Sequence, residues 1–131
     1  MKVLFVCILA GFLIGCGNSV KENTKTDTEN KSVIGSLEVM KEDLGVMVWE
    51  PAEQACEKLC NGWRLPSLEE LEIVYKNRMQ IGGFEEGYYW SSSESLDESI
   101  SNAMIIIRFG IGDQFYNGKQ TPNHVRAVRD L

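Results

Sequence analysis

The chain has 131 residues and carries 13 lysine and arginine side chains against 19 aspartate and glutamate side chains, a formal net charge of −6. This length fits one domain, and the excess of acid argues against nucleic-acid binding, because an acidic surface repels the phosphate backbone. All of the excess lies beyond residue 36, since residues 1–15 contain one lysine and residues 17–36 balance three lysines with three acids.

The first 15 residues have the pattern of a secretory signal peptide. Lys2 precedes an apolar run from Val3 to Ile14, a short basic region followed by a hydrophobic one. Such a run spans about 18 Å as a helix, well short of the roughly 30 Å hydrocarbon core of a bilayer. An uncleaved membrane helix is therefore the weaker alternative, and we expect residues 1–15 to be a signal peptide that is removed.

The signal ends in Leu13-Ile14-Gly15-Cys16, which resembles the lipobox of bacterial lipoproteins. The resemblance implies that Cys16 becomes the first mature residue and is acylated, and two or more acyl chains anchor a protein stably. The alternative is an ordinary cleavage site that happens to contain a cysteine. Gly17 stands where an aspartate would retain many lipoproteins on the inner membrane, so the resemblance favours the outer membrane or cell surface. Residues 16–36 would then be the lipidated cysteine and a polar, disordered tether.

The remaining residues, 37–131, are expected to form one domain. Residues 37–40 and 46–49 have the apolar pattern of short strands, and the turn-like residues between them predict an opening hairpin. A helix is expected from Glu50-Pro51 to Asn61-Gly62, because proline suits the first helical turn and glycine the left-handed position that ends a helix.

Two cysteines, Cys56 and Cys60, fall on this helix. Four positions apart, their Cα atoms would lie about 6 Å from each other, which a disulfide tolerates. The sequence therefore allows two alternatives, a disulfide between Cys56 and Cys60 or two separate thiols that face the core. A metal site is not expected, because two thiols and the single His124 form a poor ligand set.

A second helix follows the turn Trp63-Arg64-Leu65-Pro66. Ser67 and Glu70 have the spacing of a capping box, in which each side chain binds a free N–H group of the other residue. The apolar residues that follow recur at helical spacing. We expect Trp63 to pack beneath this helix, and Arg64 to bind carbonyls or a carboxylate such as that of Glu70.

The second half of the chain is expected to consist of strands and loops. We expect an aromatic-rich strand at residues 88–93, followed by an acidic loop at 94–102. A strongly apolar strand is expected at 103–109, a return strand at 113–116 and a final alternating strand at 124–129. An early hairpin, two helices and an antiparallel strand-and-loop half together predict an α+β fold.

Three motifs occur in order along this domain, W-R-L-P-S-L-E-E-L at residues 63–71, Y-W-S-S at residues 89–92 and V-R-A-V-R at residues 125–129. Together they resemble the Fibrobacter succinogenes major paralogous domain and the C-terminal domain of the Legionella collagen-like adhesin. The resemblance implies a C-type-lectin-like fold and a place among bacterial surface proteins and lipoproteins. Many members have a cysteine at the position of Ala127, able to pair with one equivalent to Cys56; here that bridge is absent.

Five residues of the second half are candidates for ligand binding. Tyr89 and Trp90 carry rings that can stack on a sugar, and because neighbours on a strand point to opposite sides, one of the two is expected to be exposed. Glu94, Asp97 and Glu98 lie in one acidic loop and offer oxygen ligands for calcium. Their spacing fits no known calcium loop, and a solvated loop is the simpler interpretation.

An enzyme is not expected, and no cofactor is implied, because the sequence shows no nucleophile–base pair or metal cluster. Nothing local would place a serine and an acid beside His124, the only histidine. We expect a non-catalytic binding domain on a lipid-anchored envelope protein, with a glycan or another surface protein as ligand. The alternative is a structural subunit of the envelope or of an appendage, for which an open edge strand or a broad apolar patch is expected.

Overall fold

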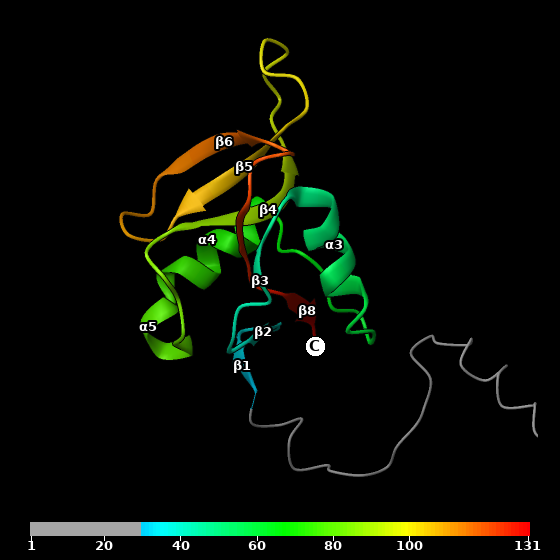
Figure 1. Ribbon diagram of the computed structural model, residues 1–131. Coiled ribbons are helices and arrows are strands. Elements are labelled where there is room, and N and C mark those ends of the chain that lie inside the picture. The colour runs from blue at the N-terminus through cyan, green and yellow to red at the C-terminus, as the bar shows by residue number, and fades with distance from the viewer. Residues whose placement is uncertain (1–29) are drawn as a thin grey trace, which may run out of the picture.

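The computed structural model describes residues 30–131 (Figure 1). The signal peptide expected over residues 1–15, the lipidation site expected at Cys16 and the first part of the tether lie outside the described residues. No helix in residues 30–131 has the length and apolar character that a membrane crossing requires.

Two sheets form the frame of the domain. The small sheet has the order β1-β2-β8 and the large sheet the order β3-β7-β4-β5-β6. All neighbouring strands run antiparallel except β4 and β7, which pair in parallel with Tyr89 opposite His124. The strands are β1 (Lys31–Ile34), β2 (Leu37–Met40), β3 (Gly45–Met47), β4 (Tyr88–Glu94), β5 (Ala103–Arg108), β6 (Gln114–Gly118), β7 (Asn123–Val125) and β8 (Val128–Asp130).

Helices cover both faces of the large sheet. They are α3 (Trp49–Glu57), α4 (Leu68–Lys76) and α5 (Arg78–Ile81), and Figure 1 shows α3 on one side of the sheet and α4 with α5 on the other. Because successive strand residues point to opposite faces, Tyr89 joins the apolar cluster that includes Leu71 and Val74 of α4. Trp90 joins the second cluster, which includes Ala52 and Cys56 of α3. The domain thus has two apolar cores with the sheet between them.

The first strand lies where the sequence predicts tether. The expectation of disorder up to residue 36 is wrong for Lys31–Ile34, which pair with β2 residue by residue. Ile34 packs against the first core cluster, and the Lys31 ammonium lies 3.3 Å from the Glu38 carboxylate. These partners are contributed by β2 and the core, so the short polar sequence by itself carries little sign of the strand. The described domain therefore begins before residue 37.

The hairpin predicted between residues 37–40 and 46–49 does not form. β2 pairs with β1 and β8, whereas β3 pairs with β7 in the other sheet. The cause lies at the end of the chain, where Arg126 and Ala127 interrupt the single strand expected over residues 124–129. One C-terminal segment therefore supplies a strand to each sheet, and the opening hairpin is β1–β2.

Both predicted helices are shorter than expected. α3 ends at Glu57, and the chain then turns through three residues with positive φ, Cys60 at 61°, Asn61 at 53° and Gly62 at 86°. The second helix is interrupted at Asn77, whose side-chain amide donates to the Ile73 carbonyl at 2.8 Å. Such a local side-chain bond competes with the backbone bonds that would continue a helix.

Candidate functional site

The three sequence motifs meet in space. Arg64 and Val128 exchange two backbone hydrogen bonds, each 2.9 Å long, which join the first motif to the third. The Ser92 N–H donates to the Pro66 carbonyl at 2.8 Å and joins the first motif to the second. Residues that are dozens of positions apart therefore form one structural unit, which accounts for their occurrence together.

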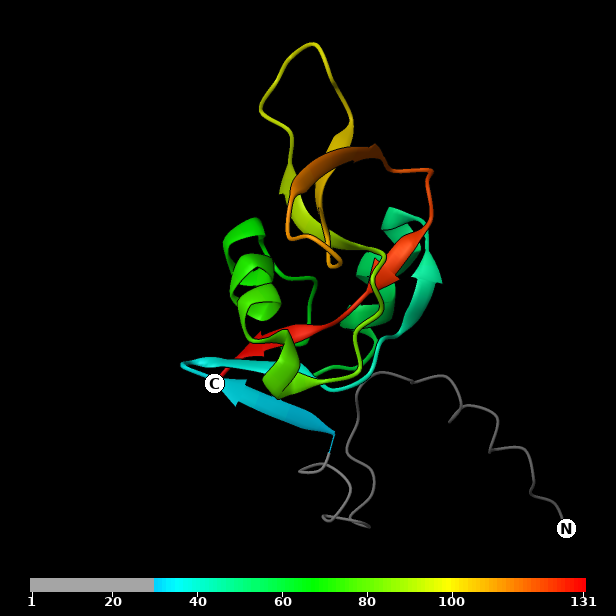
Figure 2. The same cartoon turned by 90° about the vertical axis from the view of Figure 1, so that its left-hand side faces the viewer.

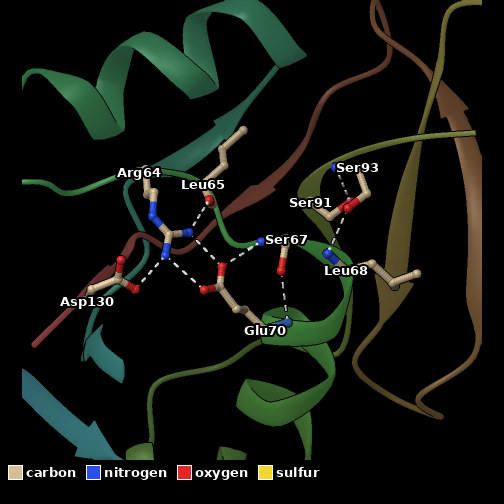
Figure 3. A network of polar contacts seen from close by, with 8 residues as sticks. All are labelled: Arg64, Leu65, Ser67, Leu68, Glu70, Ser91, Ser93 and Asp130. Atoms are coloured by element: carbon tan, nitrogen blue, oxygen red, sulfur yellow. Dashed lines mark hydrogen bonds and ion pairs between the residues drawn. The ribbon is translucent and has the colours of Figure 1, made fainter. Parts of the chain in front are cut away.

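The predicted capping box is present at the start of α4 (Figure 3). The Ser67 hydroxyl accepts from the Glu70 N–H at 3.2 Å, and Glu70 Oε1 accepts from the Ser67 N–H at 2.9 Å. A third donor of the helix start, the Leu68 N–H, binds the Ser93 hydroxyl at 2.9 Å. The serine that directly follows the Y-W-S-S motif thus helps to cap a helix that lies more than twenty residues away.

Arg64 binds Glu70, one of the partners expected from the sequence. Its Nη1 and Nη2 donate to the two carboxylate oxygens at 2.6 and 2.8 Å, and Nη2 also donates to Asp130 at 2.9 Å (Figure 3). The guanidinium lowers the pKa of the Glu70 carboxyl, and Glu70 raises the pKa of Arg64. Trp63 is only 8% exposed and belongs to the second core cluster. The motif therefore organises the fold.

Tyr89 and Trp90 are both fully buried, so the expectation of an exposed aromatic at one of them is wrong. The Trp90 indole donates to the Met47 carbonyl at 2.8 Å, and the Tyr89 hydroxyl donates to Asp43 Oδ2 at 2.8 Å. Burial raises the pKa of Tyr89. The alternation of the strand holds, but helices cover both faces of the sheet and neither ring is open to a ligand.

A buried polar cluster surrounds Asp43. Arg126, 1% exposed, donates to Asp43 Oδ1 at 2.8 Å and to three carbonyls, those of Met40, Gly82 and Gly83. His124 Nδ1 lies 3.4 Å from Asp43 Oδ2, and the histidine ring stacks on Tyr89. The carboxylate therefore binds three neighbours, Tyr89 of β4 and His124 and Arg126 of the C-terminal segment. This arrangement joins loops to the large sheet.

Cys56 is a free thiol with no exposed surface, so the disulfide between Cys56 and Cys60 does not form. The helical spacing on which that expectation rested is lost, because α3 ends at Glu57 and Cys60 has a φ of 61°. Burial raises the pKa of Cys56 to about 12, which keeps the thiol uncharged. Ala127 lies in the same core cluster as Cys56 and is equally buried.

The three acidic candidates lie at an exposed loop. Glu94 ends β4, with its carboxylate 3.8 Å from the Lys119 ammonium. Asp97 accepts hydrogen bonds from the Ser99 hydroxyl at 2.6 Å and from the Ser99 N–H at 2.9 Å, which lower the pKa of Asp97. Glu98 is exposed beside it. Within residues 30–131, no three His, Cys, Asp or Glu side chains lie close enough to hold a metal ion, so the geometry gives the calcium interpretation no support.

The same loop presents a residue that the sequence analysis missed. Leu96 is 96% exposed, in the yellow segment that projects from the body of the domain in Figures 1 and 2. Both views place this loop at the end opposite β1, where the described chain begins. A single leucine among acids carries no sequence signal of its own, and only the shape of the domain reveals it.

Exposed aromatic residues also occur where the sequence analysis did not expect them. Phe115 and Tyr116 of β6 are 38% and 49% exposed. The Phe115 ring meets the Tyr88 ring edge to face, with centroids 5.6 Å apart. β6 is the last strand of the large sheet, so its outer edge has no partner strand among the described residues.

Two open hollows complete the surface. One, of about 410 Å³, is lined by residues that include Trp63, Lys31 and Arg129, and the last two bind the buried Glu38 carboxylate, whose pKa they lower. The other, of about 460 Å³, lies beside α5 and includes Phe84 and Phe109. The two cationic side chains that line the first hollow are thus already engaged with Glu38.

The family model of the Lcl C-terminal domain matches residues 20–129. No curated protein sequence matches the chain. Among solved structures, this chain is similar to one chain in the complex of botrocetin with a mutant von Willebrand factor A1 domain. The two are 12% identical, with a TM-score of 0.56 over 79% of this chain and 98% of that chain. The snake venom toxin convulxin is 14% identical, with a TM-score of 0.58 over 79% of this chain and 96% of the convulxin chain. A chain in the complex of rhodocetin with an integrin α2-A domain is 15% identical, with a TM-score of 0.54 over 79% of this chain and 98% of that chain. The predicted α+β, C-type-lectin-like fold is confirmed.

Proposed function

This chain belongs to the Lcl C-terminal domain family, and from that premise we propose that it binds another protein at the cell envelope without catalysing a reaction. Solved structures of the same fold include complexes with protein partners, a von Willebrand factor A1 domain and an integrin domain. A glycan ligand loses its main support, because the two rings proposed to stack on a sugar, Tyr89 and Trp90, are buried.

The observation that carries the proposal is the projecting loop of residues 95–102. Leu96 stands out from it at 96% exposure, next to the exposed acids Asp97 and Glu98. The loop is closed at its base by a bond from the Ser95 N–H to the Ala103 carbonyl at 2.9 Å, and a turn is closed by a bond from the Ile100 N–H to the Asp97 carbonyl at 2.9 Å. An apolar side chain with flanking charges suits a partner with an apolar socket and a basic rim.

Replacing Leu96 with alanine is expected to weaken binding of the protein ligand about tenfold, because an exposed side chain that fills a socket contributes on the order of 1.4 kcal/mol. The soluble segment 17–131 would be immobilised and exposed to fractionated envelope proteins and, in parallel, to a glycan array. Dissociation constants would then be measured for the protein retained.

Leu131→Ala is the matched control, because Leu131 is another exposed leucine, 69% accessible, outside the loop. The proposal fails if both leucine variants bind the retained protein as tightly as the unchanged chain. It also fails if the chain binds glycans on the array and no envelope protein.

We also propose that a lipid on Cys16 holds this domain on the outer membrane or cell surface. Cys16→Ser is expected to move the protein from the membrane fraction to the soluble fraction and to abolish incorporation of labelled palmitate, because no thiol remains to carry the acyl chains. Cys7→Ser, which changes a cysteine inside the expected signal, should leave both unchanged. A Cys16→Ser protein that stays in the membrane fraction would exclude the lipid anchor.

A second candidate function, a structural subunit that assembles with other copies, is favoured by one observation. Among residues 30–131, β6 ends the large sheet as an open edge, the feature expected of a structural role.

A further inference from the structure

β6 is the least protected edge strand in the described domain. It has five residues, Gln114–Gly118, without a charge or a proline. The opposite edge of the large sheet, β3, has three residues, and in the small sheet β1 begins with a lysine and β8 bridges to Arg64. Proteins commonly guard exposed edges with charges, prolines or short strands, because free N–H and C=O groups invite another strand.

The hydrogen-bonding pattern of β5 identifies which groups of β6 are free. The Arg108 N–H donates to the carbonyl of Asp113, which directly precedes β6. The next N–H group, that of Phe109, donates to the carbonyl of Gly87, which directly precedes β4 on the other side of β5. Because bonded pairs alternate along antiparallel strands, even-numbered residues of β5 bond toward β6. In the observed register these residues face Phe115 and Asn117. The backbone groups that point outward therefore belong to Gln114, Tyr116 and Gly118, and of these the Gly118 carbonyl already accepts from the Thr121 N–H at 3.1 Å.

We propose that two copies of this chain associate by pairing their β6 strands antiparallel, with Tyr116 opposite Tyr116 of the second copy. This register brings the three outward-pointing residues of one copy against the same three of the other. A two-fold interface of this kind must be self-complementary. The proposal goes beyond the binding function and does not depend on the Leu96 loop.

The charges beside β6 match this register. Asp113 and Lys119 flank the strand, three positions before and three after Tyr116. In the antiparallel pair, Asp113 of each copy faces Lys119 of the other, on the side of the sheet where Phe115 also lies. A parallel pair would instead bring like charges together, which destabilises cross-strand neighbours. The second copy is therefore a better occupant of this edge than an unrelated strand.

The Lys119 side chain is already held on that side. Its ammonium lies 4.7 Å from the centre of the Trp49 ring and 3.8 Å from Glu94, and Asp113 is exposed. A pair of five-residue strands covers less than the roughly 800 Å² per partner of a standard interface. The expected dimer is accordingly weak, with a dissociation constant on the order of 10–100 μM.

Sedimentation equilibrium of the segment 17–131 between about 5 and 500 μM tests the interface. The unchanged chain is expected to pass from monomer to dimer across this range. Tyr116→Pro should remain monomeric throughout, because proline removes an outward N–H and is tolerated at a strand edge. Tyr116→Thr, which keeps the N–H and suits a strand, should still dimerise. An unchanged chain that is monomeric at every concentration would overturn the proposal.

Charge exchange tests the register. Asp113→Lys and Lys119→Asp should each weaken self-association at least tenfold, because each brings like charges together twice. Mixed in equal amounts, the two variants should form a heterodimer, in which every facing pair is opposite in charge. The chain carrying both changes should regain dimerisation. Two single variants that dimerise as well as the unchanged chain, or that fail to associate when mixed, would exclude this register.

Discussion

Replacing Arg126 with methionine is expected to lower the free energy of unfolding by about 3–5 kcal/mol. The side chain is 1% exposed, binds Asp43 and three carbonyls, and lies over the Phe84 ring at 3.8 Å. Methionine fills much of the volume but donates no hydrogen bond. The Asp43 carboxylate, itself largely buried, then loses its charged partner, and a buried charge without a partner is costly.

Urea unfolding followed by tryptophan fluorescence measures this loss. A domain of this size has a total stability of about 5–15 kcal/mol, so the variant should unfold at a much lower urea concentration. Arg108→Met is the matched control, because Arg108 is exposed on β5 and its change should cost within about 0.5 kcal/mol. If the two variants unfolded together, Arg126 would not be the hub that its contacts indicate.

Replacing Trp90 with alanine is expected to lower the free energy of unfolding by about 3–5 kcal/mol. The ring has no exposed surface and packs in the core cluster beneath α3. Alanine would leave a cavity there and would also leave the Met47 carbonyl without its indole donor. Thermal unfolding followed by circular dichroism would show the loss as a lower melting temperature.

The variant Trp90→Phe separates the two contributions. Phenylalanine keeps an aromatic ring in the core but cannot donate to Met47, so a smaller loss of about 1–3 kcal/mol is expected. If the alanine variant kept its stability and lost only ligand binding, the burial of Trp90 would be contradicted, because only an exposed aromatic ring is expected to behave in this way.

Local signals in the sequence identify most of the elements correctly. The capping box of Ser67 and Glu70 involves residues three positions apart and forms as expected. The apolar stripe of α4 buries Leu71 and Val74, and the apolar run at β5 forms a buried strand. Each of these features depends on neighbours within one turn or one strand, so its physical cause is contained in a short stretch of sequence.

The motifs add information of longer range. The ion pair of Arg64 and Glu70 spans six positions and is expected from the sequence, whereas its third member, Asp130, is not. The resemblance carried by the three motifs predicts a C-type-lectin-like fold, and the structure shows why they occur together, because they exchange backbone hydrogen bonds.

The candidate site follows the sequence much less closely. Tyr89 and Trp90 have the alternation of a half-exposed strand, but helices cover both faces of the sheet, and both side chains are buried. Leu96 and the aromatic residues of β6 were not expected at the surface, because their exposure depends on where the loop projects and where the sheet ends. No periodicity in the chain distinguishes an edge strand from a central one.

By itself, the sequence of this protein determined the starts of α3 and α4, most of its strand segments and its family, because capping, amphipathic spacing and motif order act over short distances. Only the tertiary structure decided that β2 and β3 belong to different sheets, that Arg126 turns inward to divide the last strand, and that β6 has no outer partner strand in the part of the chain that the structure describes. The physical reason is that strand pairing and burial are interactions with partners far away along the chain, and those partners are selected only when the two cores assemble.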